Sequence, residues 1–209
     1  MRQLEGFRAV DASQSNPFAT RYTRPGELPF IFDEETEDGL ATVEKLLSRL
    51  RELGWWAEIV GPHGSGKTTL LTHLLKAVRN TGMAISLFTL RDGQRRLPRG
   101  WQAMIQAGSL IAIDGYEQLR YVARWRVKRR CRQEGAGLIV TAHSSMRLPT
   151  LYRTHASLEV SRQVIERLLP HGAPRPSDDE LVHLLDVFHG NLREVLFALY
   201  DRYEPPQQA

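Results

Sequence analysis

The sequence predicts an α/β protein whose parallel β-sheet is covered by helices on both faces. Three observations support this fold class. Short apolar runs alternate with longer stretches that repeat apolar residues at helical spacing, which is typical of βαβ units. A glycine-rich turn, GPHGSGKT, follows the first of these runs and precedes a helical stretch. From residue 161 onward the pattern is helical only, so we expect a small helical unit after the sheet.

The expected strands are short and mostly apolar. They span residues 55–60, 83–90, 109–114, 138–142 and 157–160. Helical spacing of leucine and valine predicts helices over 40–53, from Lys67 to a stop at 80–82, over 101–107 and over 118–133. Three more helices are expected in the C-terminal part. The second of them opens with the capping box SDDE at 177–180, and the third is expected to be capped by Asn191.

Composition excludes several classes of protein. The 209 residues are 42% hydrophobic and 25% charged, as in an ordinary water-soluble domain. The single cysteine, Cys131, excludes an internal disulfide and a cysteine-rich zinc site. No run approaches the length of a membrane span and the N-terminus lacks a signal peptide's apolar segment, so we expect a cytoplasmic protein with no membrane contact. The net charge of +4 argues only weakly for a nucleic-acid partner.

The turn GPHGSGKT satisfies the pattern G-x-x-x-x-G-K-[ST] in the required strand, loop and helix context. Its glycines let the backbone approach phosphate oxygens closely. Lys67 is expected to reach the β- and γ-phosphates, and the Thr68 hydroxyl to bind Mg²⁺. The roles of His63, Ser65 and Thr69 stay open between phosphate contact and loop filling. The residues expected to hold the nucleotide are Gly61, Pro62, His63, Gly64, Ser65, Gly66, Lys67, Thr68 and Thr69.

The third expected strand ends in a carboxylate. Asp114 follows four apolar residues, and the carboxyl ends of parallel strands form the edge at which ligands bind. A carboxylate there can hold Mg²⁺ opposite Thr68, so these two residues are the expected metal ligands. Glu117 either activates an attacking water or stabilises the start of the following helix.

Residues 61–68, Asp114 and the polar end of the fourth strand resemble the P-loop ATPases of the additional-strand class, which includes the AAA+ and the STAND or NACHT families. The acid three residues after Asp114 is similar to the STAND or NACHT pattern, whereas Glu directly follows Asp in the AAA+ form. The resemblance covers about residues 55–200. It implies a three-layer P-loop NTPase sandwich with about five strands in the order 5-1-4-3-2 and a small C-terminal helical lid.

The resemblance also implies catalytic roles for polar side chains. Thr141 or His143 stands where the family carries sensor 1, which detects the γ-phosphate. Arg193 lies in HGNLRE, which resembles the sensor 2 segment, whose arginine reaches the nucleotide from the lid. Structural alternatives stay open: the first two residues cap a strand, and the arginine forms a surface ion pair. The candidate catalytic set is Lys67, Glu117, Thr141, His143 and Arg193.

Four regions are expected along the chain: an N-terminal arm packed on the core over 1–39, the nucleotide-binding core over 40–160, the helical lid over 161–204 and a flexible tail over 205–209. The arm carries aromatic side chains without clear periodicity. These side chains either stack on a nucleotide base or, as we favour, anchor the arm to the core. They are Phe18, Tyr22, Phe30 and Phe32.

The stretch from Arg120 to Arg132 is expected to be helical and holds seven basic residues without an acid among them. It either contacts nucleic-acid phosphates or covers the sheet as a solvated outer helix. We favour the outer helix, because the chain as a whole has little basic excess. Its expected partly buried residues are Leu119, Val122, Trp125 and Cys131.

The function that these patterns favour is a Mg²⁺-dependent ATPase of the AAA+ or STAND type, which acts as a nucleotide switch or small motor through a homo-oligomer or a protein partner. A small P-loop kinase is an alternative, with the basic loops 91–99 and 147–153 holding the acceptor. A nucleotide-gated module that binds nucleic acid through Arg120 to Arg132 is another. Arg147 and Arg153 are the places where we would look for an arginine finger.

Overall fold

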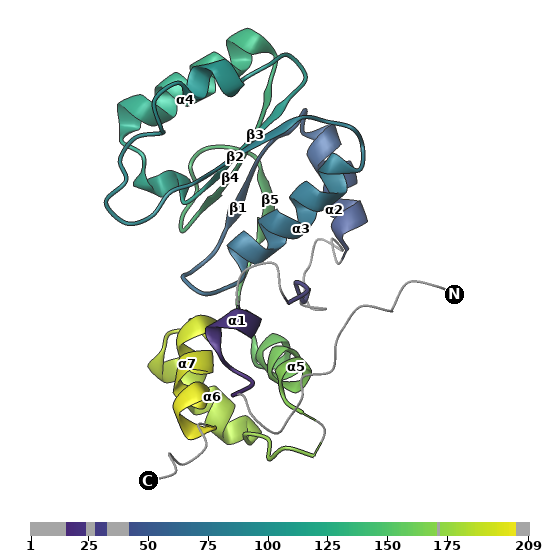
Figure 1. The fold of residues 1–209 in the computed structure, drawn as a ribbon, viewed down its shortest axis with the longest axis vertical. Helices are drawn as coiled ribbons and strands as arrows, with labels where there is room; N and C mark the ends of the chain where they lie inside the picture. The colour runs from purple at the N-terminus through teal and green to yellow at the C-terminus, as the bar shows by residue number, and fades with distance from the viewer. Residues whose placement is uncertain (1–15, 24–27, 33–41, 171, 204–209) are drawn as a thin grey trace.

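A five-stranded parallel sheet lies at the centre of the computed structural model, which describes residues 16–23, 28–32, 42–170 and 172–203 (Figure 1). The strands are β1 (Trp56–Val60), β2 (Ile85–Thr89), β3 (Leu110–Asp114), β4 (Gly137–Ala142) and β5 (Thr150–Arg153). Their order is β2-β3-β4-β1-β5, and every pair is parallel. The expected order 5-1-4-3-2 is therefore confirmed.

Strand β4 lies between β1, which precedes the glycine-rich turn, and β3, which ends in Asp114. Its register pairs Val60 with Ala142 and Ile113 with Val140. All three strands run in the same direction, so their carboxyl ends meet at one edge of the sheet. The candidate site residues follow these ends.

Helices cover both faces of the sheet, which gives three layers. Helices α2 (Val43–Glu52) and α3 (Lys67–Arg79) pack on one face, and α4 (Tyr121–Glu134) packs on the other (Figure 1). The alternation of side chains along a strand divides β3 between the two cores. Ala112 faces α3, whereas Ile111 and Ile113 face α4.

The lid is a three-helix unit of α5 (Leu158–Leu168), α6 (Asp178–Val187) and α7 (Leu192–Arg202), which lies beyond the carboxyl edge of the sheet (Figure 1). Its core includes Ile165, Leu181 and Val195. The short helix α1 (Thr20–Thr23) lies beside the lid. Phe18, just before α1, is fully buried in the lid core and packs edge to face on Tyr203.

The aromatic residues of the arm pack on two different parts of the protein. Phe18 and Tyr22 belong to the lid core. Phe30 and Phe32 pack on the sheet beside Tyr152, with ring centroids 5.9 and 5.8 Å from it. Anchoring therefore accounts for these side chains, although Phe30 also lines the cavity at the carboxyl edge of the sheet that is described below. Most of the arm, residue 40 and the tail 205–209 lie outside the described residues.

The fifth strand was expected in the wrong place. It comprises Thr150–Arg153, whereas residues 157–160 begin α5. The Ser157 hydroxyl accepts the N–H of Val160 at 3.2 Å, which makes Ser157 a helix N-cap. Ser157 therefore starts a helix, and residues 158–160 form its first turn.

Other boundaries also differ from expectation. Residues 101–107 contain only a 3₁₀ turn, Trp101–Met104, and another 3₁₀ turn, Tyr116–Gln118, precedes α4. Helix α4 covers the sheet as expected, but Val122 and Trp125 are 55% and 51% exposed. The inward stripe of α4 consists of Val127 and Cys131, four residues apart on one face. No helix in the described part of the chain has the length and apolar character needed to cross a bilayer.

A buried carboxylate fixes the loop between β4 and β5. Glu58, in β1, is fully buried. Its Oε2 accepts the backbone N–H of Met146 at 2.8 Å and that of Leu148 at 3.3 Å, and the Thr150 hydroxyl donates to Oε1 at 3.4 Å. The loop that follows the candidate sensor residues is therefore held from below by β1.

Replacing Glu58 with leucine should destabilise the protein by about 3 kcal/mol, because the buried N–H of Leu148 and the partly buried N–H of Met146 lose their acceptor. Urea unfolding measures this change. Glu52→Leu is the matched control, since Glu52 is 63% exposed and its ion pair is with Arg49, one helical turn away. A Glu58→Leu protein as stable as the Glu52→Leu protein would contradict the assigned role.

Candidate nucleotide-binding site

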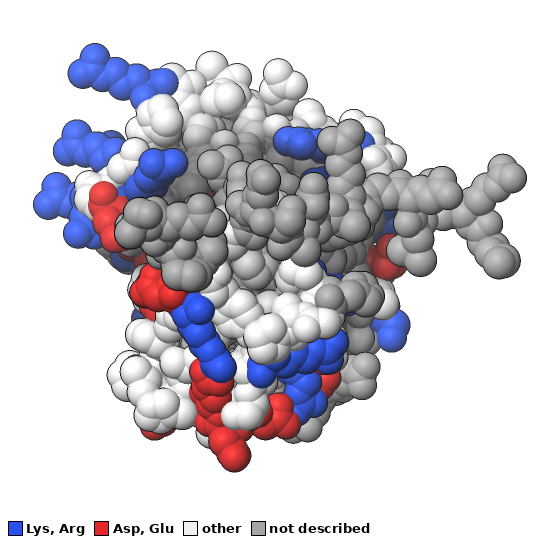
Figure 2. Space-filling view, turned by 60° about the horizontal axis from the view of Figure 1, so that its bottom comes forward, with Lys and Arg blue, Asp and Glu red and all other residues white. Residues whose placement is uncertain are grey.

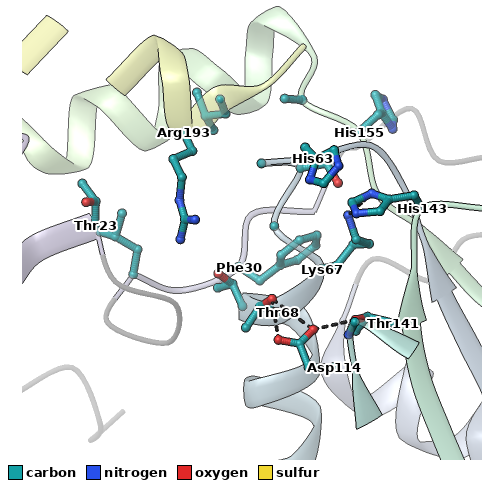
Figure 3. Close-up of a pocket in the computed structure, with 18 of the residues that line it drawn as sticks. Thr23, Phe30, His63, Lys67, Thr68, Asp114, Thr141, His143, His155 and Arg193 are labelled. Atoms are coloured by element: carbon teal, nitrogen blue, oxygen red, sulfur yellow. Dashed lines mark hydrogen bonds between the residues drawn. The ribbon is translucent and has the colours of Figure 1, made fainter. Parts of the chain in front are cut away.

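A cavity of about 470 Å³ opens between the carboxyl edge of the sheet and the lid (Figure 3). The turn between β1 and α3 forms its floor, the ends of β3 and β4 form one wall, and α5 and α7 close the opposite side. Part of the wall is apolar and is formed by Phe30, Ile31, Val160, Val164 and Leu196. The cavity has the size and mixed lining of a small-ligand site.

The glycine-rich turn has the geometry of an anion cradle. Gly64 and Gly66 have φ of +68° and +90°, a region that side chains disfavour. Helix α3 begins directly after Gly66, with no side-chain cap and no acid in its first turn. Its free N–H groups and the positive end of its dipole therefore face the cavity.

Lys67 is bent back onto this turn. Its Nζ donates to the carbonyl oxygens of Gly61 at 2.8 Å and Pro62 at 2.6 Å. Burial lowers the pKa of Lys67, and the nearby carboxylates of Glu117 and Asp114 oppose that shift. The ammonium thus lies against the cradle, within reach of an anion placed there.

Asp114, the last residue of β3, joins this strand to helix α3 and to strand β4. The Thr68 hydroxyl donates to Asp114 Oδ2 at 3.0 Å, and the Thr141 hydroxyl donates to Oδ1 at 2.5 Å (Figure 3). Thr141 in turn accepts the N–H of Gly115 at 2.9 Å. The structure therefore brings Thr68 and Asp114 together, and it places Thr141 beneath the carboxylate as its support.

The paired oxygens of Thr68 and Asp114 fit Mg²⁺, which prefers oxygen ligands and is usually held by one or two protein groups with phosphates and water. Within the described residues no group of three or more His, Cys, Asp or Glu side chains could hold a metal by itself. Here too, phosphates and water would have to complete the coordination of an ion.

The His143 ring lies between the Glu117 carboxylate and the Lys67 ammonium. Its Nε2 lies 2.9 Å from Glu117 Oε1, and its Nδ1 lies 3.4 Å from Lys67 Nζ. Burial, and then Lys67, lower the pKa of His143, so the neutral ring donates its Nε2 proton to Glu117. The imidazole of His63 lies against that of His143, with the ring centroids 3.6 Å apart and the ring planes tilted by 36°.

The bridge leaves one carboxylate oxygen free. Glu117 Oε2 is buried without a hydrogen-bond partner among the described residues. Leaving a buried oxygen without a hydrogen bond costs free energy, so such an oxygen in a folded protein calls for an explanation such as a catalytic role. This pairing was not apparent from the sequence, because Glu117 and His143 lie on different segments and neither belongs to the P-loop motif.

Two lid residues reach the cradle. Arg193, at the start of α7, points into the cavity and makes no ion pair with another described residue (Figure 3). The Asn191 side chain lies so close to Gly64 that a Cβ at Gly64 would meet its Oδ1 at 1.8 Å. Asn191 was expected to cap α7, but its side chain makes no capping hydrogen bond, because it lies against the P-loop instead.

Thr154, just after β5, is a second contact that sequence reasoning missed. Its Oγ1 lies 2.6 Å from the hydroxyl of Ser65, which also donates to the Pro62 carbonyl at 2.8 Å. A Cβ at Gly61 would meet Thr154 Oγ1 at 2.2 Å, so glycine is required there. Ser65 therefore fixes the loop from inside, and the segment that leads to the lid contacts the turn directly.

Comparison with known proteins gives matches at the level of structure. No protein-family model and no curated protein matches the sequence. A replication initiator DnaA bound to AMPPCP and single-stranded DNA aligns with 86% of this chain and 64% of its own, at 15% identity and a TM-score of 0.58. DnaA from Aquifex aeolicus with AMPPCP aligns with 82% of this chain and 63% of its own, at 15% identity and a TM-score of 0.54.

A RuvB variant from Thermotoga maritima also aligns, with 80% of this chain and 61% of its own, at 16% identity and a TM-score of 0.52. The chain thus spans about three-fifths of the length of the solved structures it matches. At this identity the likeness concerns the fold. It confirms the expected P-loop NTPase fold, a three-layer sandwich around a parallel sheet, which this chain shares with the DnaA and RuvB structures.

Proposed function

We propose that the protein binds ATP with Mg²⁺ in the cavity and hydrolyses the terminal phosphate, acting as a nucleotide switch. One observation carries the proposal: Asp114 and Thr68 are in contact at 3.0 Å beside a buried Lys67 at the mouth of an anion cradle. The binding of AMPPCP by similarly folded DnaA proteins supports nucleotide as the ligand.

The chain's own residues divide the work of phosphate binding. Phosphate oxygens are charged acceptors and so stronger ones than the carbonyls of Gly61 and Pro62, which Lys67 now uses. Lys67 therefore turns from these carbonyls to the phosphates. The Thr68 hydroxyl and the Asp114 carboxylate would hold Mg²⁺, which when bound neutralises charge on the β- and γ-phosphates.

Glu117 is the proposed general base. His143 holds its Oε1, which leaves Oε2 to accept a proton from a water molecule as the water oxygen attacks the γ-phosphorus. The bond between that phosphorus and the bridging oxygen then breaks, and ADP and phosphate result. Arg193 is proposed to meet the γ-phosphate from the lid, so that nucleotide biases the lid position.

Exchanging Lys67 for alanine and Glu117 for glutamine should separate binding from hydrolysis. Lys67→Ala should abolish both, because the cradle loses its cation. Glu117→Gln should bind MgATP like the wild type and release phosphate about 100-fold more slowly or worse. Nucleotide titration and phosphate-release assays measure the two steps.

The matched controls are Lys76→Ala, an exposed lysine on the same helix, and Glu134→Gln at the far end of α4. Both should behave like the wild type. Undiminished binding by Lys67→Ala would refute the site, and undiminished turnover by Glu117→Gln would refute the base.

The pH profile of turnover should report His143. Its pKa is lowered from the ordinary value of 6.5, so the ring is neutral near pH 7 and becomes protonated only below pH 6.5. A proton on His143 would repel Lys67 and weaken Glu117 as a base. The rate should therefore fall as the pH drops below 6.5.

His143→Gln, which keeps an amide donor for Glu117, should lose this acid limb while retaining turnover at neutral pH. His183→Gln is the control, because His183 is exposed on α6, and it should keep the limb. An acid limb that survives unchanged in His143→Gln would assign the limb to another group.

A further inference from the structure

A second cavity, of about 830 Å³, lies between the loop 91–100 and the first turn of α4, and it shares no lining residue with the nucleotide cavity. All of its lining residues belong to the described part of the chain, and none is acidic. We name it the arginine groove after the five arginines that line it: Arg95, Arg96, Arg99, Arg120 and Arg126.

The groove is a built feature, although its arginines are exposed. The backbone N–H of Arg120 donates to the carbonyl of Arg95 at 3.4 Å, which joins the loop to the start of α4. Leu97 and Trp101 pack against the core cluster beneath α4 and anchor the loop. Two segments that are far apart in the sequence therefore hold their arginines around one hollow.

The start of α4 adds a second attraction for anions. Arg120 is the N-cap residue, yet its side chain makes no capping hydrogen bond, and the first turn contains no acid. Residues of this first turn line the groove. The uncapped N–H groups and the positive helix end thus reinforce the arginines.

Aromatic side chains stand beside these cations. Tyr121 lines the groove and is 76% exposed, and Trp101 lines its other side. One turn further along α4, Trp125 is 51% exposed, with the guanidinium of Arg129 5.3 Å from its ring. Exposed rings among arginines offer faces on which unpaired bases stack.

Two arginines of the lid are placed differently. On the lid, Arg162 pairs with Asp178 and Glu159, and Arg202 pairs with Glu180. Figure 2 shows acidic and basic side chains lying beside one another over the lower part of the face it presents. The arginine groove, in contrast, has no acid in its lining.

We propose that the arginine groove binds a single strand of nucleic acid. The arginines and the N-terminus of α4 hold consecutive phosphates, and Tyr121 stacks on an unpaired base. In a duplex the bases are paired and stacked on one another, so Tyr121 could not reach a base face. This proposal does not depend on the nucleotide site, because the two cavities have separate linings.

The test is fluorescence anisotropy with labelled oligothymidylate and oligouridylate of about 16 nucleotides, and with a DNA duplex of equal length. The wild type should bind at least one single strand more tightly than the duplex. With about four phosphates neutralised, its affinity should fall about 50-fold between about 50 and 200 mM salt. Tyr121→Ala should weaken single-strand binding about tenfold.

The double variant Arg96→Glu with Arg126→Glu should weaken binding at least about 30-fold. Its matched control, Arg51→Glu with Arg79→Glu, makes the same charge change at exposed residues of α2 and α3 on the opposite face of the sheet, and it should bind within about threefold of the wild type. Circular dichroism confirms that both variants are folded. Absent binding, equal losses in the two variants, or a duplex bound as tightly as the single strands would overturn the proposal.

Discussion

The carboxylate of Asp114 is the contact on which the architecture of the site depends. It accepts hydrogen bonds from Thr68 at the start of α3 and from Thr141 in β4. The segment after β1, the end of β3 and the end of β4 are thereby fixed to one another. Asp114 is buried, so the hydrogen-bond partners of its carboxylate are needed to offset the cost of burying the charge.

Strand order makes this contact possible. Because β4 separates β1 from β3, the P-loop and the carboxylate flank a strand whose own polar end faces the same cavity. That end supplies Thr141 beneath Asp114 and His143 beside Lys67. Glu58 then holds the next loop in place through two backbone N–H groups. The sheet therefore supports the site from below, and α5 and α7 of the lid line it from the other side.

Much of this arrangement was predictable from the sequence. The P-loop is a local pattern whose glycines, lysine and threonine each have a physical task, and the run that ends in Asp114 reads directly as a strand with a carboxylate at its tip. The fifth strand was misplaced because Ser157 acts as a helix cap, a choice that the apolar pattern of the following residues does not reveal. Exposure of Val122 and Trp125 was missed because it depends on the rotation of α4 against the sheet.

The contacts that sequence reasoning could not reach join distant segments. The pairing of Glu117 with His143 and the contact of Asn191 with Gly64 arise only after the sheet and lid are assembled. The arginine groove belongs to the same class, because a loop before β3 and a helix after it each contribute part of its charge. Each segment alone reads as a solvated basic stretch, and only their juxtaposition makes a groove.

The most direct test of the account is a crystal structure with AMPPCP and Mg²⁺. It should show the triphosphate on the turn before α3, with Lys67 Nζ moved from the carbonyls of Gly61 and Pro62 to the phosphates, and with the metal held by Thr68 and Asp114. A cavity without nucleotide at saturating ligand, with Lys67 still bonded to those carbonyls, would contradict the central claim.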